Sequence, residues 1–152
     1  MQFLDRAKFE SRDNGRTPFQ WSNAKNAGFT TGTPWIAVNP NYVNINAAKE
    51  ETDSNSCLNY FRKLVKLRKN NPVLVYGNYT LLDTDNRAIY AYLRTGEGQK
   101  MLVLLNFSVH TARTRIQIPS SDLKLTLSNL SKEGRKTDFE LRPYEALIYK
   151  VN

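Results

Sequence analysis

Residues 73–152 consist mainly of short segments in which polar and apolar side chains alternate, and this pattern constrains the fold more than any other feature. Turn signals separate the segments, such as TDN at 84–86 and the two glycines of TGEGQ at 95–99. Short strands with turns about every 8 to 12 residues are typical of an antiparallel β-sandwich or barrel. The predicted strands are YTLLD (79–83), AIYAYLR (88–94), KMLVLLNF (100–107), ARTRIQIP (112–119), LKLTLSNL (123–130), DFEL (138–141) and EALIYKV (145–151).

Two of these segments also predict which faces are covered. KMLVLLNF is apolar along its length, which fits a central strand packed on both faces. ARTRIQIP alternates instead, which fits a strand with one buried and one exposed face. Its two sets are Ala112, Thr114, Ile116 and Ile118 on one face, and Arg113, Arg115 and Gln117 on the other.

Residues 53–70 have the spacing of one amphipathic helix. Leu58, Phe61, Leu64 and Val65 form an apolar stripe along it. Asp53 or Ser54 is the expected N-cap, and Asn70-Asn71-Pro72 is the expected end. Residues 1–52 are rich in loop signals and show little periodicity, which is uncommon inside a compact domain. We expect that this first part takes its shape from something outside itself.

Composition excludes several classes of site. The single cysteine, Cys57, excludes an internal disulfide and a zinc site of several thiolates, and the single histidine, His110, makes a His-rich metal site implausible. We therefore expect no metal and no cofactor. No apolar run approaches the ~20 residues of a membrane span, and the charged N-terminus lacks a signal-peptide core. The expectation is a soluble protein, with the cytoplasm favoured.

The chain carries a formal net charge of +8, which raises a polyanion as a partner. The basic residues are scattered, however, and alternating arginines such as Arg113 and Arg115 on a strand are ordinarily a solvated face. We therefore expect neither nucleic acid nor a membrane as a partner, and keep a basic polyanion-binding domain as an alternative.

Two long motifs in the first part identify a family resemblance. SRDNGRTPFQW at 11–21, followed by NAGFTTGTPWIAVNPNY at 26–42, closely resembles a segment of glycoside hydrolase family 13, the alpha-amylase family, in its oligo-1,6-glucosidase and α-glucosidase branch. NYFRKLVKLRKNNPVLVYGNY at 59–79 is similar to the last barrel helix of that family and its exit into the next domain. Gly15 and Phe19 depart from the family text, which has Ala and Met at these places.

The resemblance implies a fold that is mainly β. A C-terminal antiparallel Greek-key β-sandwich, over residues 73–152, would follow residues 1–72. These would be a long loop and one amphipathic helix left over from a truncated (β/α)8 barrel. A complete barrel needs ~250 residues, so we expect a C-terminal piece of a longer enzyme.

The resemblance also implies the chemistry of the parent. The family hydrolyses α-glucosidic bonds with retention, using a carboxylate nucleophile and a carboxylic acid about 5 Å apart. In the family these groups, and a third stabilising Asp, lie on barrel strands that would precede residue 1. Asp5, Glu10 and Asp13 match none of the three motifs. We therefore assign no catalytic residue and expect no glucosidase activity from this chain alone.

By the same resemblance, Arg12 and Arg16 are the candidate substrate-binding residues. Arg12 matches the family arginine that reaches the glucose and its carboxylates, and Arg16 matches the second arginine, which lines the neighbouring sugar site or braces the loop. The structural alternative for both is that they tie the loop to the barrel. Phe19 and Trp21 could stack on a sugar ring or pack against the barrel. Trp35 has the same two interpretations, and a position in a core is favoured.

Two further expectations concern partners. In the intact parent the partner is an oligosaccharide substrate. A small sandwich cannot cover all of Leu58, Phe61, Leu64 and Val65, so we expect self-association through an exposed helix face, or disorder in residues 1–50. A second alternative is a non-catalytic carbohydrate-binding module, for which the available aromatic residues are Tyr60, Tyr76, Tyr79, Tyr90 and Tyr92. Because these tyrosines are spread over the helix and the strands, we expect them to fill an interface rather than to form a binding platform.

Overall fold

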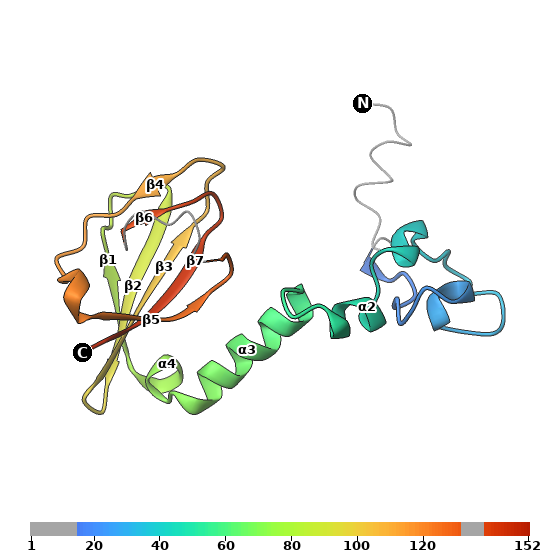
Figure 1. Ribbon diagram of the computed structural model, residues 1–152, viewed down its shortest axis with the longest axis horizontal. Coiled ribbons are helices and arrows are strands. Elements are labelled where there is room, and N and C mark those ends of the chain that lie inside the picture. Colours follow the sequence, from blue (N-terminus) through green and yellow to red (C-terminus); the bar gives the residue numbers. More distant parts are fainter. Residues whose placement is uncertain (1–14, 132–138) are drawn as a thin grey trace. The chain divides into compact units, whose positions relative to one another are not determined.

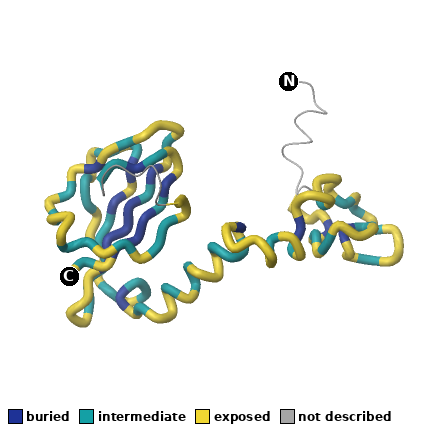
Figure 2. Tube along the Cα trace, viewed as in Figure 1, coloured by how far each residue is buried: buried dark blue, intermediate teal, exposed yellow. Residues whose placement is uncertain are grey.

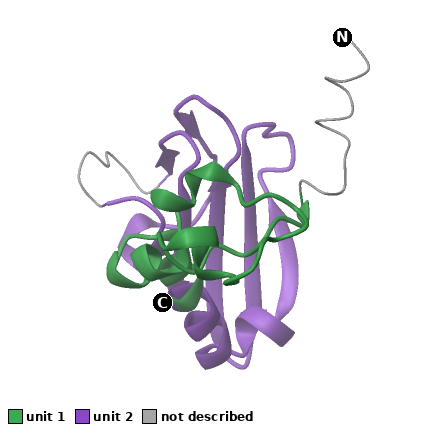
Figure 3. Cartoon of the chain, turned by 90° about the vertical axis from the view of Figure 1, so that its right-hand side faces the viewer, with its two compact units in different colours: residues 1–62 green, residues 63–152 purple. Residues whose placement is uncertain are grey.

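The computed structural model describes residues 15–131 and 139–152 of the chain. The chain divides into two compact units, Met1–Arg62 and Lys63–Asn152 (Figure 3). The domain boundary predicted between residues 72 and 73 stays a prediction. In the described parts of the chain, none of the helices has the length and apolar character that a bilayer crossing requires.

Two antiparallel sheets form most of the second unit (Figure 1). The larger has the strand order β1-β2-β3-β7-β5, and the smaller pairs β4 with β6. From β3 the chain goes to β4 in the small sheet, returns as β5, leaves again as β6 and comes back as β7 between β3 and β5. This arrangement confirms the predicted mainly β fold with a β-sandwich. The strands are β1 (Asn78–Leu82), β2 (Ile89–Gly96), β3 (Gln99–Asn106), β4 (Ala112–Arg113), β5 (Leu123–Ser128), β6 (Glu140–Leu141) and β7 (Ala146–Val151).

The core of this unit lies on both faces of β3, which is the middle strand of the larger sheet. Leu102 and Leu104 belong to one buried cluster, together with residues of β2, β6 and β7. Met101 and Val103 belong to a second cluster on the other face, where partly buried side chains of the helices join it. Figure 2 shows this buried centre in dark blue. The prediction that residues 100–107 form a central strand covered on both faces is confirmed.

The strand predicted over 112–119 is shorter than expected. Within the described part of the chain, strand pairing in this segment is limited to Ala112 and Arg113. The next backbone donors turn elsewhere: Thr114 N–H donates to the Phe139 carbonyl at 2.9 Å, and Arg115 N–H donates to the Asp83 carboxylate at 3.0 Å. The predicted alternation persists without the pairing, since the predicted inner set is less exposed than Arg113, Arg115 and Gln117.

The helix predicted over 53–70 is present as one helix that begins four residues later, at Cys57, and ends at the predicted residue, Asn70. Three α-helices follow one another: α2 (Ala47–Thr52), α3 (Cys57–Asn70) and α4 (Val73–Tyr76). The expected caps Asp53 and Ser54 are wrong, because Asp53 is the residue that ends α2. Ser56 caps α3 instead: its hydroxyl accepts the Asn59 N–H at 3.2 Å.

Polar side chains, rather than a large apolar core, organise the described part of the first unit. It contains the short 3-10 turns η2 (Lys25–Gly28) and η3 (Pro40–Val43) and helix α2. Within residues 15–62, Ala27 is the buried hydrophobic core residue. Two polar residues of this range, Asn46 and Ser56, are also buried. The sequence-based expectation of a loop-rich region without a core of its own agrees with this.

Candidate functional site

The candidate site is the loop around residues 15–21 and the segments that hold it. Arg12 lies outside the described residues, so its predicted role in substrate binding stays a prediction. Arg16 is exposed, and its guanidinium carbon lies 5.5 Å from the centre of the Trp35 ring. This distance is within the range of a cation–π contact. Arg16 and Trp35 are 19 positions apart in the sequence and belong to the two different motifs. The two motifs therefore meet through these side chains.

Trp35 is not in a core. Its side chain is 83% exposed, so the expectation of a buried Trp35 is wrong. Large aromatic residues usually lose more of their surface than this to neighbouring groups. The guanidinium of Arg16 is the contact that the ring makes instead.

Phe19 and Trp21 form a second aromatic contact in the same unit. Their ring centres are 4.5 Å apart with an angle of 59° between the planes, an arrangement that aromatic rings favour. Both side chains remain more than half exposed, at 56% and 57%. The pair is therefore available to a ligand or to another part of a protein.

The backbone of this loop is fixed by hydrogen bonds from two directions. The carbonyls of Gln20 and Trp21 accept the N–H groups of Ala47 and Ala48, at 2.8 and 2.9 Å, where α2 begins. Asn46 is the N-cap of α2, and its side chain accepts the N–H of Lys49 at 3.0 Å. The residues that follow Phe19 are thus tied to the start of a helix.

A second tie comes from the turn at residues 26–28. The N–H groups of Trp21 and Ser22 donate to the Ala27 carbonyl at 2.9 and 3.0 Å. Asn26, Ala27 and Gly28 all have positive φ, at 54°, 58° and 68°. A Cβ on Gly28 would come within 2.7 Å of the Ser22 hydroxyl, so this tight turn needs glycine there.

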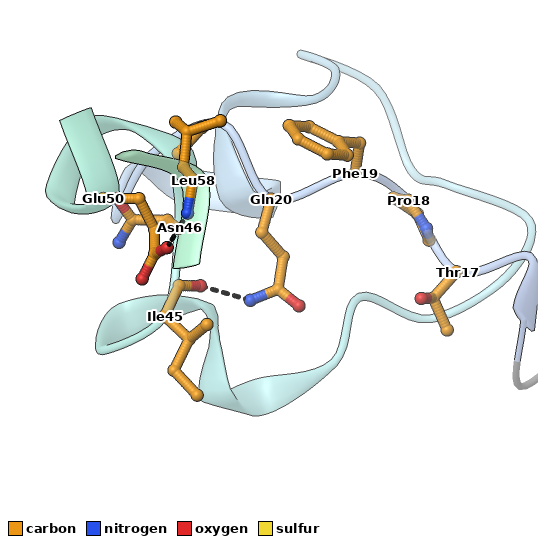
Figure 4. Close-up of a pocket in the computed structure, with 9 residues that line it drawn as sticks. Thr17, Pro18, Phe19, Gln20, Ile45, Asn46, Glu50 and Leu58 are labelled. Carbon is orange, nitrogen blue, oxygen red and sulfur yellow. Dashed lines mark hydrogen bonds between the residues drawn. The ribbon is translucent and has the colours of Figure 1, made fainter. Parts of the chain in front are cut away.

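A pocket of about 400 Å³ lies in the first unit, between this loop and the segment around α2 (Figure 4). The Gln20 side-chain amide donates to the Ile45 carbonyl across it. The Glu50 carboxylate accepts the Leu58 N–H at 3.1 Å and is thereby held at the first turn of α3. The residues that line the pocket are Thr17, Pro18, Phe19, Gln20, Ile45, Asn46, Ala47, Glu50 and Leu58.

The link between α2 and α3 is also polar. Arg62 forms a bidentate ion pair with Glu51, at 2.5 and 2.6 Å. This hydrogen-bonded arginine lowers the pKa of the Glu51 carboxyl. The Asn59 amide donates to the carbonyls of Glu50 and Asp53, at 2.9 and 2.8 Å.

Sequence reasoning did not predict the positioning residues of this unit. Gln20, Asn46 and Glu50 were not singled out, although they hold the loop and line the pocket. One signal was present: Asn46 directly precedes AAKEET, a good helix-forming segment, and Asn is a favoured N-cap. Within residues 15–131 and 139–152, three or more His, Cys, Asp or Glu side chains do not gather in a group that could hold a metal ion.

Comparison with known families places this loop in a definite context. Residues 1–77 match the family model of the alpha amylase catalytic domain. The chain belongs to the alpha-amylase family. Residues 79–148 match the model of the maltogenic amylase C-terminal domain, which covers the β-sandwich. The first match includes both motifs of the loop, so the predicted family is confirmed.

Relatives within the family agree with the predicted branch. The chain is 43% identical over 145 residues to oligo-1,6-glucosidase from Bacillus cereus, covering 93% of this chain and 26% of that protein. It is 40% identical over 154 residues to oligo-1,6-glucosidase from Parageobacillus thermoglucosidasius, covering 99% and 27%. The chain therefore spans about a quarter of the length of these relatives.

Solved structures give the same result for the fold. Isomaltulose synthase from Klebsiella sp. LX3 superimposes with a TM-score of 0.85 at 41% identity, covering 99% of this chain and 27% of that one. Trehalose-6-phosphate hydrolase from Bacillus licheniformis gives a TM-score of 0.85 at 37% identity, covering 97% and 28%. Alpha-amylase family members with different reactions thus share this fold.

Proposed function

We propose that this chain is the C-terminal part of a retaining α-glucosidase of the oligo-1,6-glucosidase type. Its loop at residues 11–21 would place Arg12 and Arg16 at the sugar pocket, and its β-sandwich would be the accessory domain. The similarity to oligo-1,6-glucosidases, which includes both loop motifs, supports this. The single observation that carries it is the exposed Arg16 guanidinium over the exposed Trp35 ring. Guanidinium groups suit forked hydrogen bonds to sugar hydroxyls and to carboxylates.

In this proposal the chain supplies substrate contacts and the missing part of the enzyme supplies the chemistry. Retaining hydrolysis requires a nucleophilic carboxylate and an acid about 5 Å apart, and the family resemblance places both before residue 1. An arginine beside such carboxylates would lower their pKa values and keep the nucleophile ionised. The chain alone is then inactive, and purified protein should release no nitrophenol from p-nitrophenyl α-glucoside.

A chimera provides the stronger test. The corresponding segment of the Bacillus cereus oligo-1,6-glucosidase is replaced by this chain, and kcat/KM is measured on isomaltose, maltose, sucrose and trehalose. Arg12→Ala and Arg16→Ala are each expected to lower kcat/KM by about 100-fold, as loss of a charged contact at a reacting sugar does. Arg115→Ala, an exposed arginine of the sandwich, is the matched control and should leave kcat/KM unchanged. Equal kcat/KM in all three variants would contradict the proposal, and the substrate panel gives the linkage preference.

We also propose that the isolated chain associates with itself through the exposed side of α3. Phe61 is 61% exposed on that helix, which is a large apolar side chain left in water. Sedimentation velocity at several concentrations tests this, with Phe61→Ser expected to reduce the associated fraction. A single concentration-independent monomer species would contradict it. A cytoplasmic location stays a prediction.

A further inference from the structure

Three tyrosines gather at one edge of the larger sheet, in a part of the molecule that the proposed function does not use. Tyr79 lies on the edge strand β1, and Tyr90 and Tyr92 lie on β2 (Figure 1). The ring of Tyr92 is 5.3 Å from the ring of Tyr79 and 5.3 Å from that of Tyr90. We call Tyr79, Tyr90 and Tyr92 the tyrosine cluster.

Strand pairing explains why the three rings meet. Tyr79 pairs with Arg94, and Leu81 pairs with Tyr92. Because side chains alternate along a strand, Tyr79, Tyr90 and Tyr92 point to the same face of the sheet. Tyr92 also packs against the buried cluster of Met101 and Val103. The cluster is therefore the outer continuation of a core, and its position is fixed by two paired strands.

The outer two rings are accessible while the inner one is not. Tyr79 is 46% and Tyr90 is 41% exposed, and burial raises the pKa of the half-buried Tyr92. The hydroxyls of Tyr79 and Tyr90 lie 2.7 Å apart and form a hydrogen bond. This bond raises the pKa of Tyr79 to about 12. The cluster thus presents aromatic faces and hydroxyl groups together.

We propose that the tyrosine cluster is a carbohydrate-binding site on the β-sandwich, which takes α-linked glucose disaccharides. The C–H groups of a pyranose ring meet the negative face of an aromatic ring, and the two phenol hydroxyls can donate to and accept from sugar hydroxyls. The planes of the outer rings are tilted by 37° and 49° from Tyr92. The choice of α-linked glucose as the ligand rests on the proposed function.

The size of the exposed surface favours a sugar over a protein partner. A stable protein interface buries about 800 Å² per partner. Less than half of each outer ring is exposed, which leaves on the order of 200 Å² of aromatic surface. That area matches one or two sugar rings. A rigid tyrosine pair also loses little conformational entropy on binding.

A titration of the full chain tests this inference. Isomaltose and maltose are added to ¹⁵N-labelled protein, with cellobiose as the β-linked comparison. Saturable shifts in the amides of β1 and β2 are expected at millimolar sugar, and cellobiose is expected to give weaker ones. Tyr79→Ala removes one outer ring and should weaken binding about tenfold. Tyr90→Phe keeps the ring but removes the hydroxyl pair, and should weaken binding about threefold. Tyr90→Phe also tests the inference if Tyr79→Ala does not fold.

Tyr76→Ala is the matched control, because Tyr76 is a highly exposed tyrosine on α4 outside the cluster. It should bind as the unchanged protein does. An equal loss in Tyr76→Ala, or no saturable shift at up to about 100 mM sugar, would overturn the inference. So would a concentration-dependent dimer that Tyr79→Ala abolishes, since the cluster would then be a protein interface.

The inference takes only its ligand class from the proposed function, and the two can fail separately. Arg16→Ala should leave the β1 and β2 shifts unchanged, because Arg16 belongs to the other unit. If the chimera variants contradict the role of Arg16 while β1 and β2 still bind sugar, the proposed function fails and the tyrosine cluster stands. If Tyr79→Ala loses the shifts while the chimera that carries it keeps its activity, the tyrosine cluster binds sugar independently of the active site.

Discussion

The Asp83 side chain joins two separate segments of the sandwich. One of its carboxylate oxygens accepts hydrogen bonds from the Asn86 amide at 2.7 Å, the Thr114 hydroxyl at 2.7 Å and the Arg115 N–H at 3.0 Å. It follows β1 and has a φ of 48°, a conformation that Asp and Asn tolerate better than most residues. Asp83 therefore connects the β1–β2 turn to the segment that leaves β4.

Asp83→Asn should destabilise the sandwich in a way that depends on pH. The three hydrogen bonds, with that of Asn86 first, lower the pKa of Asp83 from its ordinary value of 3.8. A carboxyl whose pKa is lower in the folded state stabilises the fold above its unfolded pKa, and this contribution is lost as the pH falls through the folded pKa. At pH 7 we expect a loss of about 1–2 kcal/mol in the free energy of unfolding.

Urea unfolding at pH 7 and at about pH 3 measures this difference. The gap between the unchanged protein and Asp83→Asn should narrow at the lower pH, since Asp83 is then becoming protonated. Asp85→Asn changes a neighbouring exposed carboxyl and should have little effect at either pH. A gap of the same size at both pH values would contradict the assigned role of the charge.

Single residues also mark where sequence reasoning failed. The branch of the family could be predicted because SRDNGRTPFQW and NAGFTTGTPWIAVNPNY are long and specific. The exposure of Trp35 could not be predicted, because residue type alone favours burial and does not show whether other groups cover the ring. The ties through Gln20 and Glu50 involve partners 25 and 8 positions away in the chain, which no local pattern indicates.

Helix α3 shows that an element can be predicted while its start is not. The apolar spacing predicts the helix and Asn70 as its end, both of which agree with Cys57–Asn70. The start was misplaced because Asp53, Ser54 and Ser56 are all reasonable caps by residue type. Ser56 is chosen because its hydroxyl also donates to the Glu50 carbonyl at 2.7 Å, a contact that depends on α2.

Ser56→Ala should therefore loosen the start of α3. Loss of an N-cap costs about 1 kcal/mol, and here the buried Glu50 contact is lost with it. Hydrogen exchange at the amides of residues 57–60 should accelerate roughly fivefold. Ser54→Ala replaces the cap that the sequence predicted and should have a smaller effect. Faster exchange in Ser54→Ala than in Ser56→Ala would show that the cap is misassigned.

Two neighbouring residues of the apolar stripe of α3 should respond differently to substitution. Leu64 packs against the core cluster of Met101 and Val103, whereas Phe61 is largely exposed. Leu64→Ala is expected to cost about 1–3 kcal/mol in the free energy of unfolding of the sandwich unit. Phe61→Ala should stay within about 0.5 kcal/mol. Thermal unfolding followed by circular dichroism compares them, and a larger loss for Phe61→Ala would mean that this face is packed.

At the scale of the whole molecule, the sandwich was more predictable than the first unit. Alternation along β2 and β5 and the apolar run of β3 follow directly from strand geometry, so the fold class could be predicted from pattern. The strands of the small sheet were predicted to be longer than they are, since β4 and β6 have two residues each. The first unit offers no period to interpret, because polar contacts between loops, not a repeating apolar face, hold its described residues.

This contrast predicts unequal local stability along the chain. The amides of β3 and β7 lie at the centre of a sheet with buried clusters on both faces, so they should exchange only through global unfolding. In residues 15–46, Ala27 is the buried hydrophobic core residue. The amides of this range should therefore exchange through local openings, at least about 100-fold faster than those of β3 and β7. Leu104→Ala, which removes a fully buried side chain of β3 at a cost of about 2–5 kcal/mol, should accelerate β3 and β7 together. If it accelerates residues 15–46 equally, the two units unfold as one, and the first unit has more stabilising contacts than its described residues account for.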